Sequence, residues 1–224
     1  MVTTSRAADG RLDARPATAP AGPPLEPGVS ALDLGPGAEV LLAVPPGEVA
    51  ALLVCFHGAG GSGADALRAV GDAAAARGVV VLAPTSAAAT WDLIAGGLGR
   101  DVAVLDAALG AVFARLPITR VALGGFSDGG SYALSLGVAN GDLVEAVTAF
   151  SPGFLAAPGR YGRSRFWIAH GTDDRVLPVQ RCGRRVAADL TADGYPVEYR
   201  EFAGGHVMTP DLVDDALTWW LDPS

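Results

Sequence analysis

Cysteine and histidine, the residues that most often form disulfides or bind metals, are scarce in this sequence. Two cysteines and three histidines occur among 224 residues, with no C-x-x-C pair and no cysteine–histidine spacing typical of zinc sites. Cys55 lies in an apolar run and Cys182 in a predicted helix, so we expect two reduced, structural thiols. A disulfide between them is an alternative that the sequence does not favour. We expect no metal and no cofactor.

Long apolar runs and clustered positive charge are also missing. No stretch of about 18 apolar residues occurs, and residues 1–30 contain no apolar core of a signal peptide. The net charge is −8, and the arginines are scattered, which argues against nucleic acid or anionic membranes as partners. We therefore expect a cytoplasmic protein without stable membrane association, with a small-molecule ligand. A homodimer remains open.

The remaining composition fits one folded domain preceded by an arm. Half of the 224 residues are hydrophobic, which is enough for a full-sized core. Residues 1–37 are rich in Pro, Gly and Ala without sustained periodicity, and we predict an extended arm there. Residues 38–224 alternate between short apolar runs and amphipathic stretches. That alternation predicts an α/β domain with a mostly parallel central sheet and helices on both faces.

The predicted elements follow from apolar periodicity and from glycine and proline at their ends. Strands are predicted at residues 39–44, 50–56, 79–83, 119–123, 145–150, 165–169 and 197–202. The first two are expected to form an early edge hairpin or meander. Helices are predicted at residues 64–77, 100–116, 131–138, 179–193 and 210–221. Little sequence is left for a large lid, so we expect an open cleft.

A short motif between a predicted strand and a predicted helix indicates a nucleophile. Residues 125–129 read Gly-Phe-Ser-Asp-Gly and match G-x-S-x-G, in which the serine occupies a sharp strand-to-helix turn. The glycines leave space where a Cβ atom would collide with the strand or the helix. In a glycine-rich chain the motif alone is weak, but its setting is the one the chemistry requires. Ser127 is the predicted nucleophile; a glycine-rich loop with an incidental serine is the alternative.

A second glycine-rich loop follows the strand predicted at residues 50–56. It reads His-Gly-Ala-Gly-Gly-Ser-Gly from His57 to Gly63 and lacks the G-K-[ST] ending of a phosphate-binding loop. Backbone N–H groups in such a loop can stabilise an oxyanion. We assign this role to the N–H of Ala59, with the N–H of Asp128 as the second donor. A plain turn between strand and helix is the alternative.

A serine nucleophile needs a base, and the base needs a carboxylate that fixes its tautomer. His206 lies on a glycine-flanked loop after the last predicted strand, from which it can approach Ser127. Asp173 and Asp174 are both candidates for the acid, and physical reasoning does not separate them. The order Ser127, Asp174, His206 is the Ser…Asp…His order of α/β-hydrolases.

Two further residues near these loops are candidates for a role at the site. Trp91 lies in the segment 85–99, at the predicted carboxyl end of a strand, where ligands bind in open α/β sheets. We expect it to form a wall of the substrate pocket; a core or loop-anchoring tryptophan is an equal alternative. The Asp128 carboxylate would oppose an oxyanion unless it points away or is paired. We expect it to cap the helix that follows Ser127.

The motifs together resemble the α/β-hydrolase superfamily, and within it the phospholipase/carboxylesterase-like group of predicted esterases. The resemblance spans residues 38–221, and its specific parts are residues 57–61, 91–92, 125–130, 170–178 and 204–206. It implies Ser127 as nucleophile, Asp174 as acid and His206 as base, acting on short to medium acyl esters or lysophospholipids without a metal. It also implies the N–H groups of Ala59 and Asp128 as the oxyanion hole. Many members carry glutamine at the position of Asp128, and residues 1–37 lie outside the shared core.

We therefore expect a serine carboxylesterase that works through an acyl-enzyme. Hydrolysis of another acyl bond is the first alternative: a peptide, a thioester, a lysophospholipid or a polyhydroxyalkanoate-type ester. A non-catalytic binding module is the second, since a fold does not determine a function. The presence of nucleophile, acid and base in one order favours the enzyme. The motifs do not specify the acyl chain or the alcohol.

Overall fold

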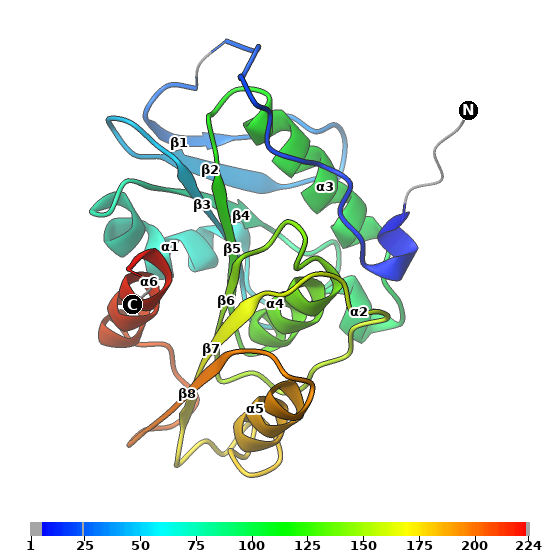
Figure 1. Cartoon of the computed structure of the whole chain (residues 1–224), viewed down its shortest axis with the longest axis vertical. Coiled ribbons are helices and arrows are strands. Elements are labelled where there is room, and N and C mark those ends of the chain that lie inside the picture. Colours follow the sequence, from blue (N-terminus) through cyan, green and yellow to red (C-terminus); the bar gives the residue numbers. More distant parts are fainter. Residues whose placement is uncertain (1–5, 24, 223–224) are drawn as a thin grey trace.

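A computed structural model describes residues 6–23 and 25–222 of the chain. Within these residues the strands are β1 (Gly28–Ala31), β2 (Val40–Val44), β3 (Ala51–Phe56), β4 (Val79–Pro84), β5 (Arg120–Phe126), β6 (Ala146–Phe150), β7 (Arg165–Gly171) and β8 (Val197–Phe202). They form one eight-stranded sheet in the order β1-β2-β4-β3-β5-β6-β7-β8 (Figure 1). β2 is antiparallel to β1 and β4, and every pair from β4 to β8 is parallel. The predicted mostly parallel sheet is confirmed.

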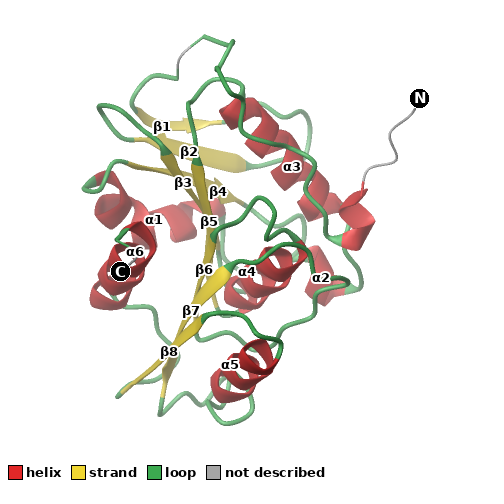
Figure 2. Cartoon of the chain, viewed as in Figure 1, coloured by secondary structure: helices red, strands yellow, loops and turns green. Residues whose placement is uncertain are grey.

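Helices cover both faces of this sheet (Figure 2). They are α1 (Gly63–Ala75), α2 (Asp92–Ala95), α3 (Arg100–Phe113), α4 (Asp128–Ala139), α5 (Gly183–Ala192), α6 (Pro210–Leu221) and the 3-10 turn η1 (Arg6–Asp9). Helices α1 and α6 pack on one face, whereas α3, α4 and α5 pack on the other. In the described part of the chain, no helix combines the length and apolar character needed to cross a bilayer.

The central strands are apolar on both sides because each face is covered. All residues of β3 and β4 are buried. In β3, Leu52 and Val54 contribute to the core under α3 and α4, whereas Leu53 and Cys55 contribute to the core under α1 and α6. Continuous apolar runs of this kind are typical of parallel strands buried between helical layers. The same runs made these strands predictable.

The start of the sheet differs from the hairpin expected for residues 39–56. Strand β4 lies between β2 and β3, and β2 pairs with β4 from Val40 opposite Pro84 to Ala43 opposite Val81. Burial explains the difference. β3 is buried throughout, so it lies at the centre of the sheet, whereas alternate residues of β2 are only half-buried. The predicted edge hairpin or meander is therefore wrong, because β2 and β3 are not neighbours, although both strands exist.

An extended arm was expected over residues 1–37, and its described residues, 6–23 and 25–37, add regular structure to the domain. Residues 1–5 and 24 lie outside the described residues. The described part of the arm includes η1 and strand β1, which pairs with β2 and extends the sheet. Between them, the backbone N–H groups of Asp13 and Ala14 donate to Asp106 on α3. The arm thus runs along α3 before it joins the sheet (Figure 1).

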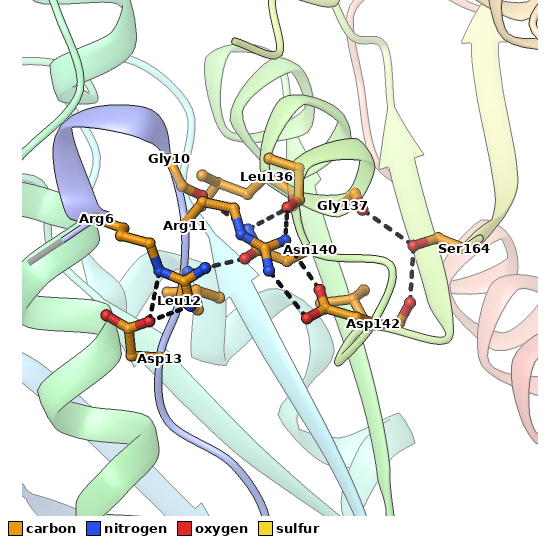
Figure 3. A network of polar contacts seen from close by, with 12 residues as sticks. Arg6, Gly10, Arg11, Leu12, Asp13, Leu136, Gly137, Asn140, Asp142 and Ser164 are labelled. Carbon is orange, nitrogen blue, oxygen red and sulfur yellow. Dashed lines mark hydrogen bonds and ion pairs between the residues drawn. The ribbon is translucent and has the colours of Figure 1, made fainter. Parts of the chain in front are cut away.

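Figure 3 shows how the arm is attached to the end of α4. Asn140 follows α4; its side-chain oxygen accepts from the Leu12 N–H at 2.8 Å, and its amide donates to the Gly10 carbonyl at 2.8 Å. Arg11 forms a two-pronged ion pair with Asp142, with both N–O distances at 2.9 Å. Leu12 and Asn140 are fully buried. The arm is therefore an integral part of the packed domain.

The two cysteines match the expected reduced state. Cys55 and Cys182 are both buried and unlinked. Burial raises the pKa of the Cys55 thiol to about 12. A thiol with a pKa this high carries almost no thiolate at neutral pH, so Cys55 behaves as a core residue.

Candidate active site

Ser127 occupies a strained turn between β5 and α4. Its backbone angles are φ 57° and ψ −118°, a region that side-chain-bearing residues rarely adopt. Two glycines make the turn possible. A Cβ atom on Gly125 would lie 2.4 Å from the carbonyl of Gly129, and one on Gly129 would lie 2.2 Å from the Phe56 carbonyl oxygen. The glycines of the motif are therefore a steric requirement.

Three side chains from separate loops meet at this turn. The Ser127 Oγ lies 2.9 Å from Nε2 of His206, and Nδ1 of His206 lies 2.7 Å from Oδ2 of Asp174. A carboxylate oxygen accepts only, so Nδ1 carries the proton and Nε2 can accept from the serine hydroxyl. Asp173 is exposed and its backbone N–H donates to Gly204. The structure thus brings Asp174, not its neighbour, to the histidine.

The environment of Asp174 keeps its carboxylate ionised. Its Oδ1 accepts from the N–H groups of Val176 and Leu177 at 2.9 and 2.8 Å. Burial raises the pKa of Asp174, but the hydrogen bonds from Leu177, His206 and Val176 lower it more, and the net pKa lies below its ordinary value. A buried, ionised carboxylate beside His206 can stabilise an imidazolium.

A second histidine, to which sequence reasoning gave no role, also contacts Asp174. His170 lies near the end of β7 and is fully buried. Its Nε2 is 2.7 Å from the Leu177 carbonyl oxygen and 3.2 Å from Oδ2 of Asp174. A carbonyl oxygen accepts only, so Nε2 carries the proton. The signal in the sequence was the spacing H-G-x-x-D, which places a histidine four residues before the acid.

The loop after β3 is held in place by His57 and Trp91. Nε2 of His57 accepts from the Ser86 N–H at 3.0 Å, so Nδ1 carries the proton that points to the Gly58 carbonyl oxygen at 2.7 Å. Trp91 donates its indole N–H to the His57 carbonyl at 2.9 Å. Trp91 is 1% exposed and stacks on Tyr132. The buried indole anchors the loop. Trp91 was expected to form a pocket wall, and the structure instead shows the loop-anchoring alternative.

Two backbone N–H groups beside Ser127 are left without a partner. Within the described residues, neither Ala59 nor Asp128 donates its backbone N–H to another protein group. The loop lies against the nucleophile, since a Cβ atom on Gly58 would be 3.5 Å from the Ser127 Cβ. The Asp128 carboxylate accepts from the Thr90 hydroxyl at 2.7 Å. We had expected the Asp128 carboxylate to cap α4, but it is paired with Thr90 and α4 has no side-chain cap.

The polar groups at this edge of the sheet suit acyl transfer. The described residues contain no group of three or more His, Cys, Asp or Glu side chains placed to hold a metal ion. The arrangement offers a hydroxyl hydrogen-bonded to a histidine, the histidine hydrogen-bonded to a carboxylate, and two nearby backbone N–H groups without a protein partner in the described residues. These are the parts with which a serine can attack a carbonyl carbon and the resulting oxyanion can be stabilised.

Solved structures share this architecture. No protein-family model and no curated protein sequence matches the chain. Esterase PE8 matches with 21% identity and a TM-score of 0.66, over 86% of this chain and 97% of that one. An S-formylglutathione hydrolase from Staphylococcus aureus has 13% identity and a TM-score of 0.68, over 87% and 99%. The fluorophosphonate-binding serine hydrolase F of the same species has 13% and 0.69, over 90% and 100%.

These matches show the fold of the protein. Identities of this size show the fold, and the chain has the α/β-hydrolase fold predicted from its sequence. In the described ranges, no inserted domain covers the carboxyl edge of the sheet where Ser127 lies.

Proposed function

We propose that the protein is a serine hydrolase that cleaves carboxylic esters of small to medium acyl chains through an acyl-enzyme intermediate. One observation carries the proposal: Ser127, His206 and Asp174 form a hydrogen-bonded line next to the unpartnered N–H groups of Ala59 and Asp128. The fold shared with esterases and other serine hydrolases adds support.

The first half of the proposed reaction is acylation of Ser127. The Ser127 Oγ attacks the carbonyl carbon of the ester while its proton passes to Nε2 of His206. The negative charge that develops on the carbonyl oxygen is held by the N–H groups of Ala59 and Asp128. When the tetrahedral intermediate collapses, the bond to the alcohol oxygen breaks and His206 returns the proton to the leaving alcohol. Asp174 stabilises the imidazolium in between.

Deacylation repeats the same steps with water. His206 takes a proton from the water molecule, whose oxygen attacks the acyl carbon. The same two N–H groups stabilise the second oxyanion. Collapse breaks the bond to the Ser127 Oγ, which regains its proton from His206, and the carboxylic acid leaves. Every proton is thus passed between the substrate, water and these side chains.

The test combines turnover with active-site labelling. We expect the wild-type chain to hydrolyse p-nitrophenyl butyrate and to be labelled by a fluorophosphonate probe at Ser127. Both signals should vanish in Ser127→Ala. A wild-type protein that is folded by circular dichroism but is neither labelled nor active would contradict the proposal and favour a binding protein.

A thioester is the second candidate bond, because the same steps cleave a carbon–sulfur bond. The solved structures with this fold include the S-formylglutathione hydrolase and, at 16% identity and a TM-score of 0.58, an acyl-protein thioesterase 2 from Zea mays. A panel of matched oxygen and sulfur esters compared by kcat/KM separates the two. A higher kcat/KM for the thioester of each matched pair would favour this second candidate.

A further inference from the structure

A groove lies beside the proposed reaction centre, between α1 and the loops that follow β3 and β8. It has a volume of about 340 Å³, and its walls come from the loop after β3, from Phe126 beside the nucleophile, from α1 and from Met208 before α6. This volume is at the low end of ligand pockets. Three of the loops that carry the proposed site therefore also contribute to one groove.

The groove is lined mainly by apolar groups. Ala66 and Ala69 of α1 line this groove, and Phe126 and Met208 line it as well. Among the described lining residues the one carboxylate is Asp65, which is exposed and already accepts hydrogen bonds from neighbours on α1 and its cap. Burying a hydrocarbon chain against such a surface is favourable by about 0.8 kcal/mol of free energy for each CH₂ group.

Two residues that line the groove lie close to the proposed reacting groups. The Phe126 ring is 4.7 Å from the His206 ring, centroid to centroid. Ala59, which follows Gly58 in the loop that contacts Ser127, is also a lining residue. A substrate with its carbonyl on Ser127 therefore has one end of its chain at the entrance to this groove.

We propose that the groove binds an unbranched alkyl chain of the ester substrate and that Ala69 keeps it open. This inference rests on the proposed esterase function and specifies its substrate. Ala69 is exposed and has a methyl side chain, so a larger side chain at this position projects into the groove without disturbing the core. The chain belongs either to the acyl group or to the alcohol, and the two are separable by experiment.

The experiment uses two substrate series with Ala69→Leu and a matched control. One series is p-nitrophenyl esters from acetate to octanoate; the other is alkyl acetates from ethyl to octyl. In one series we expect wild-type kcat/KM to rise with chain length, and Ala69→Leu to reduce the hexyl-to-ethyl or hexanoate-to-acetate ratio about tenfold. Ala75→Leu, an exposed alanine of the same helix that does not line this groove, should leave the ratio unchanged.

The series that responds identifies the chain that occupies the groove. Equal chain-length profiles for wild type and Ala69→Leu in both series would overturn the groove assignment while leaving the esterase proposal intact. Loss of all ester turnover in the wild type would instead remove the function on which the assignment rests. Circular dichroism and the melting temperature of Ala69→Leu, compared with the wild type, show whether the variant is folded.

A different observation carries a second inference, about His170. The Asp174 carboxylate is fully enclosed by donors: Oδ1 accepts from two backbone N–H groups, and Oδ2 faces both His206 and His170. The single N–H of His170 lies between the carboxylate and the Leu177 carbonyl. It therefore links the loop backbone to the acid.

The packing around His170 favours this one orientation. A Cβ atom on Gly183, the first residue of α5, would lie 2.6 Å from Nδ1 of His170. Nδ1 is buried and has no hydrogen-bond partner in the described part of the chain. A buried nitrogen without a partner destabilises the folded state. The ring orientation therefore costs stability at Nδ1, while it holds Nε2 towards Asp174.

We infer that His170 is a positioning residue that holds the Asp174 carboxylate in the orientation His206 requires. His170→Leu removes the donor, whereas the side-chain amide of His170→Gln can restore an N–H near the Nε2 position. We expect His170→Leu to lower kcat about tenfold with little change in KM, as outer partners of functional groups do. His170→Gln should recover most of the loss.

The controls separate positioning from stability. Trp167→Phe changes another fully buried residue of β7 whose indole N–H has no partner, and it should destabilise the strand without changing kcat. If His170→Leu does not fold, Gly183→Ala tests the inference, because it displaces the ring and leaves the donor in place; a similar fall in kcat is expected. Wild-type kcat in folded His170→Leu, or equal losses in the Leu and Gln variants, would overturn the inference.

Discussion

Helix α4 carries a polar network at each end, and the two networks differ in completeness. At its N-terminus, Ser127 is linked to His206 and Asp174. At its C-terminus, Asn140 and Asp142 hold the N-terminal arm (Figure 3). Both networks join residues that are far apart in the sequence, and each contains buried side chains: Ser127 and Asp174 in one, Arg11 and Asn140 in the other.

We call the network at the arm closed because the side chain of Asn140 and both carboxylate oxygens of Asp142 have partners, although Nε of Arg11 is buried without one. The network at the site is open. Asn140 uses its oxygen for Leu12 and both amide hydrogens for the carbonyls of Gly10 and Leu136. At the other end, two N–H groups beside Ser127 have no protein partner. Buried polar groups are normally satisfied. Ala59 is exposed and Asp128 is half-buried, so their N–H groups can meet solvent or a substrate, whereas the paired groups at the arm stabilise the fold.

The largest expected effect comes from breaking the open network. Ser127→Ala removes the nucleophile, and we expect kcat to fall by about 10⁴-fold or more, as for other serine triads. The free energy of unfolding should change by less than about 1 kcal/mol, because the hydroxyl contributes to chemistry more than to packing. Turnover and denaturant unfolding measure the two effects. A fall in stability comparable to that of core variants would show that this network also holds the fold.

The next effect tests whether the turn under the open network depends on its glycines. Gly129→Ala places a Cβ atom 2.2 Å from the Phe56 carbonyl oxygen. The Cβ atom and the carbonyl oxygen are both fixed to the backbone, so neither can move away by a side-chain rotation. We expect the free energy of unfolding to fall by about 3 kcal/mol and turnover to be lost together with it. Gly110→Ala, where a Cβ atom meets nothing within 4 Å, is the control and should be neutral or stabilising. Equal melting temperatures for the two variants would contradict the steric account.

The open network was predictable because its signals are local. Gly125 and Gly129 are needed for a turn that spans five residues, and the strand before them is a continuous apolar run. Its most ambiguous member, Asp174, was separated from Asp173 only by family resemblance, because neighbours on a loop have the same local pattern. The structure distinguishes them by distance to His206.

The closed network and parts of the fold lay beyond prediction because their causes are not local. Arg11 and Asn140 have no motif spacing, and their interactions depend on where the arm meets the end of α4. The partner of β2 was missed because pairing depends on which strand must be buried at the centre. Trp91 was ambiguous because pocket wall and loop anchor have the same sequence signal. The burial of Trp91 shows that it is the loop anchor.

Breaking the closed network should affect stability alone. Arg11 is 6% exposed and contacts Ala139 and Asp142, so Arg11→Ala should lower the free energy of unfolding by about 1–3 kcal/mol. Turnover should not change. Arg15→Ala removes an exposed contact to the same carboxylate and should cost about 0–1 kcal/mol. Equal losses in the two variants, or a fall in kcat for Arg11→Ala, would contradict the division of roles between the networks.

The same variant makes a pH prediction. The hydrogen bond from Arg11 is the main cause that lowers the pKa of Asp142 below its ordinary value. A carboxylate with a depressed folded-state pKa stabilises the fold above its unfolded pKa, and this contribution is lost as the pH falls through the folded value. The stability difference between wild type and Arg11→Ala should therefore shrink in acid. Urea unfolding at neutral pH and near pH 3 measures it, and a constant difference would exclude the ion pair as its source.

The smallest expected effect concerns the charge next to the open network. The Asp128 carboxylate is paired with Thr90, yet it lies one residue from the proposed nucleophile, where a negative charge would oppose the proposed oxyanion. Asp128→Asn keeps the backbone N–H and the shape of the side chain while removing that charge, so we expect kcat/KM to rise about two- to fivefold. Thr90→Val leaves the carboxylate unpaired and should lower kcat/KM instead. If both variants lowered kcat/KM equally, the carboxylate would be required at the site, and its pairing with Thr90 would belong to the catalytic arrangement.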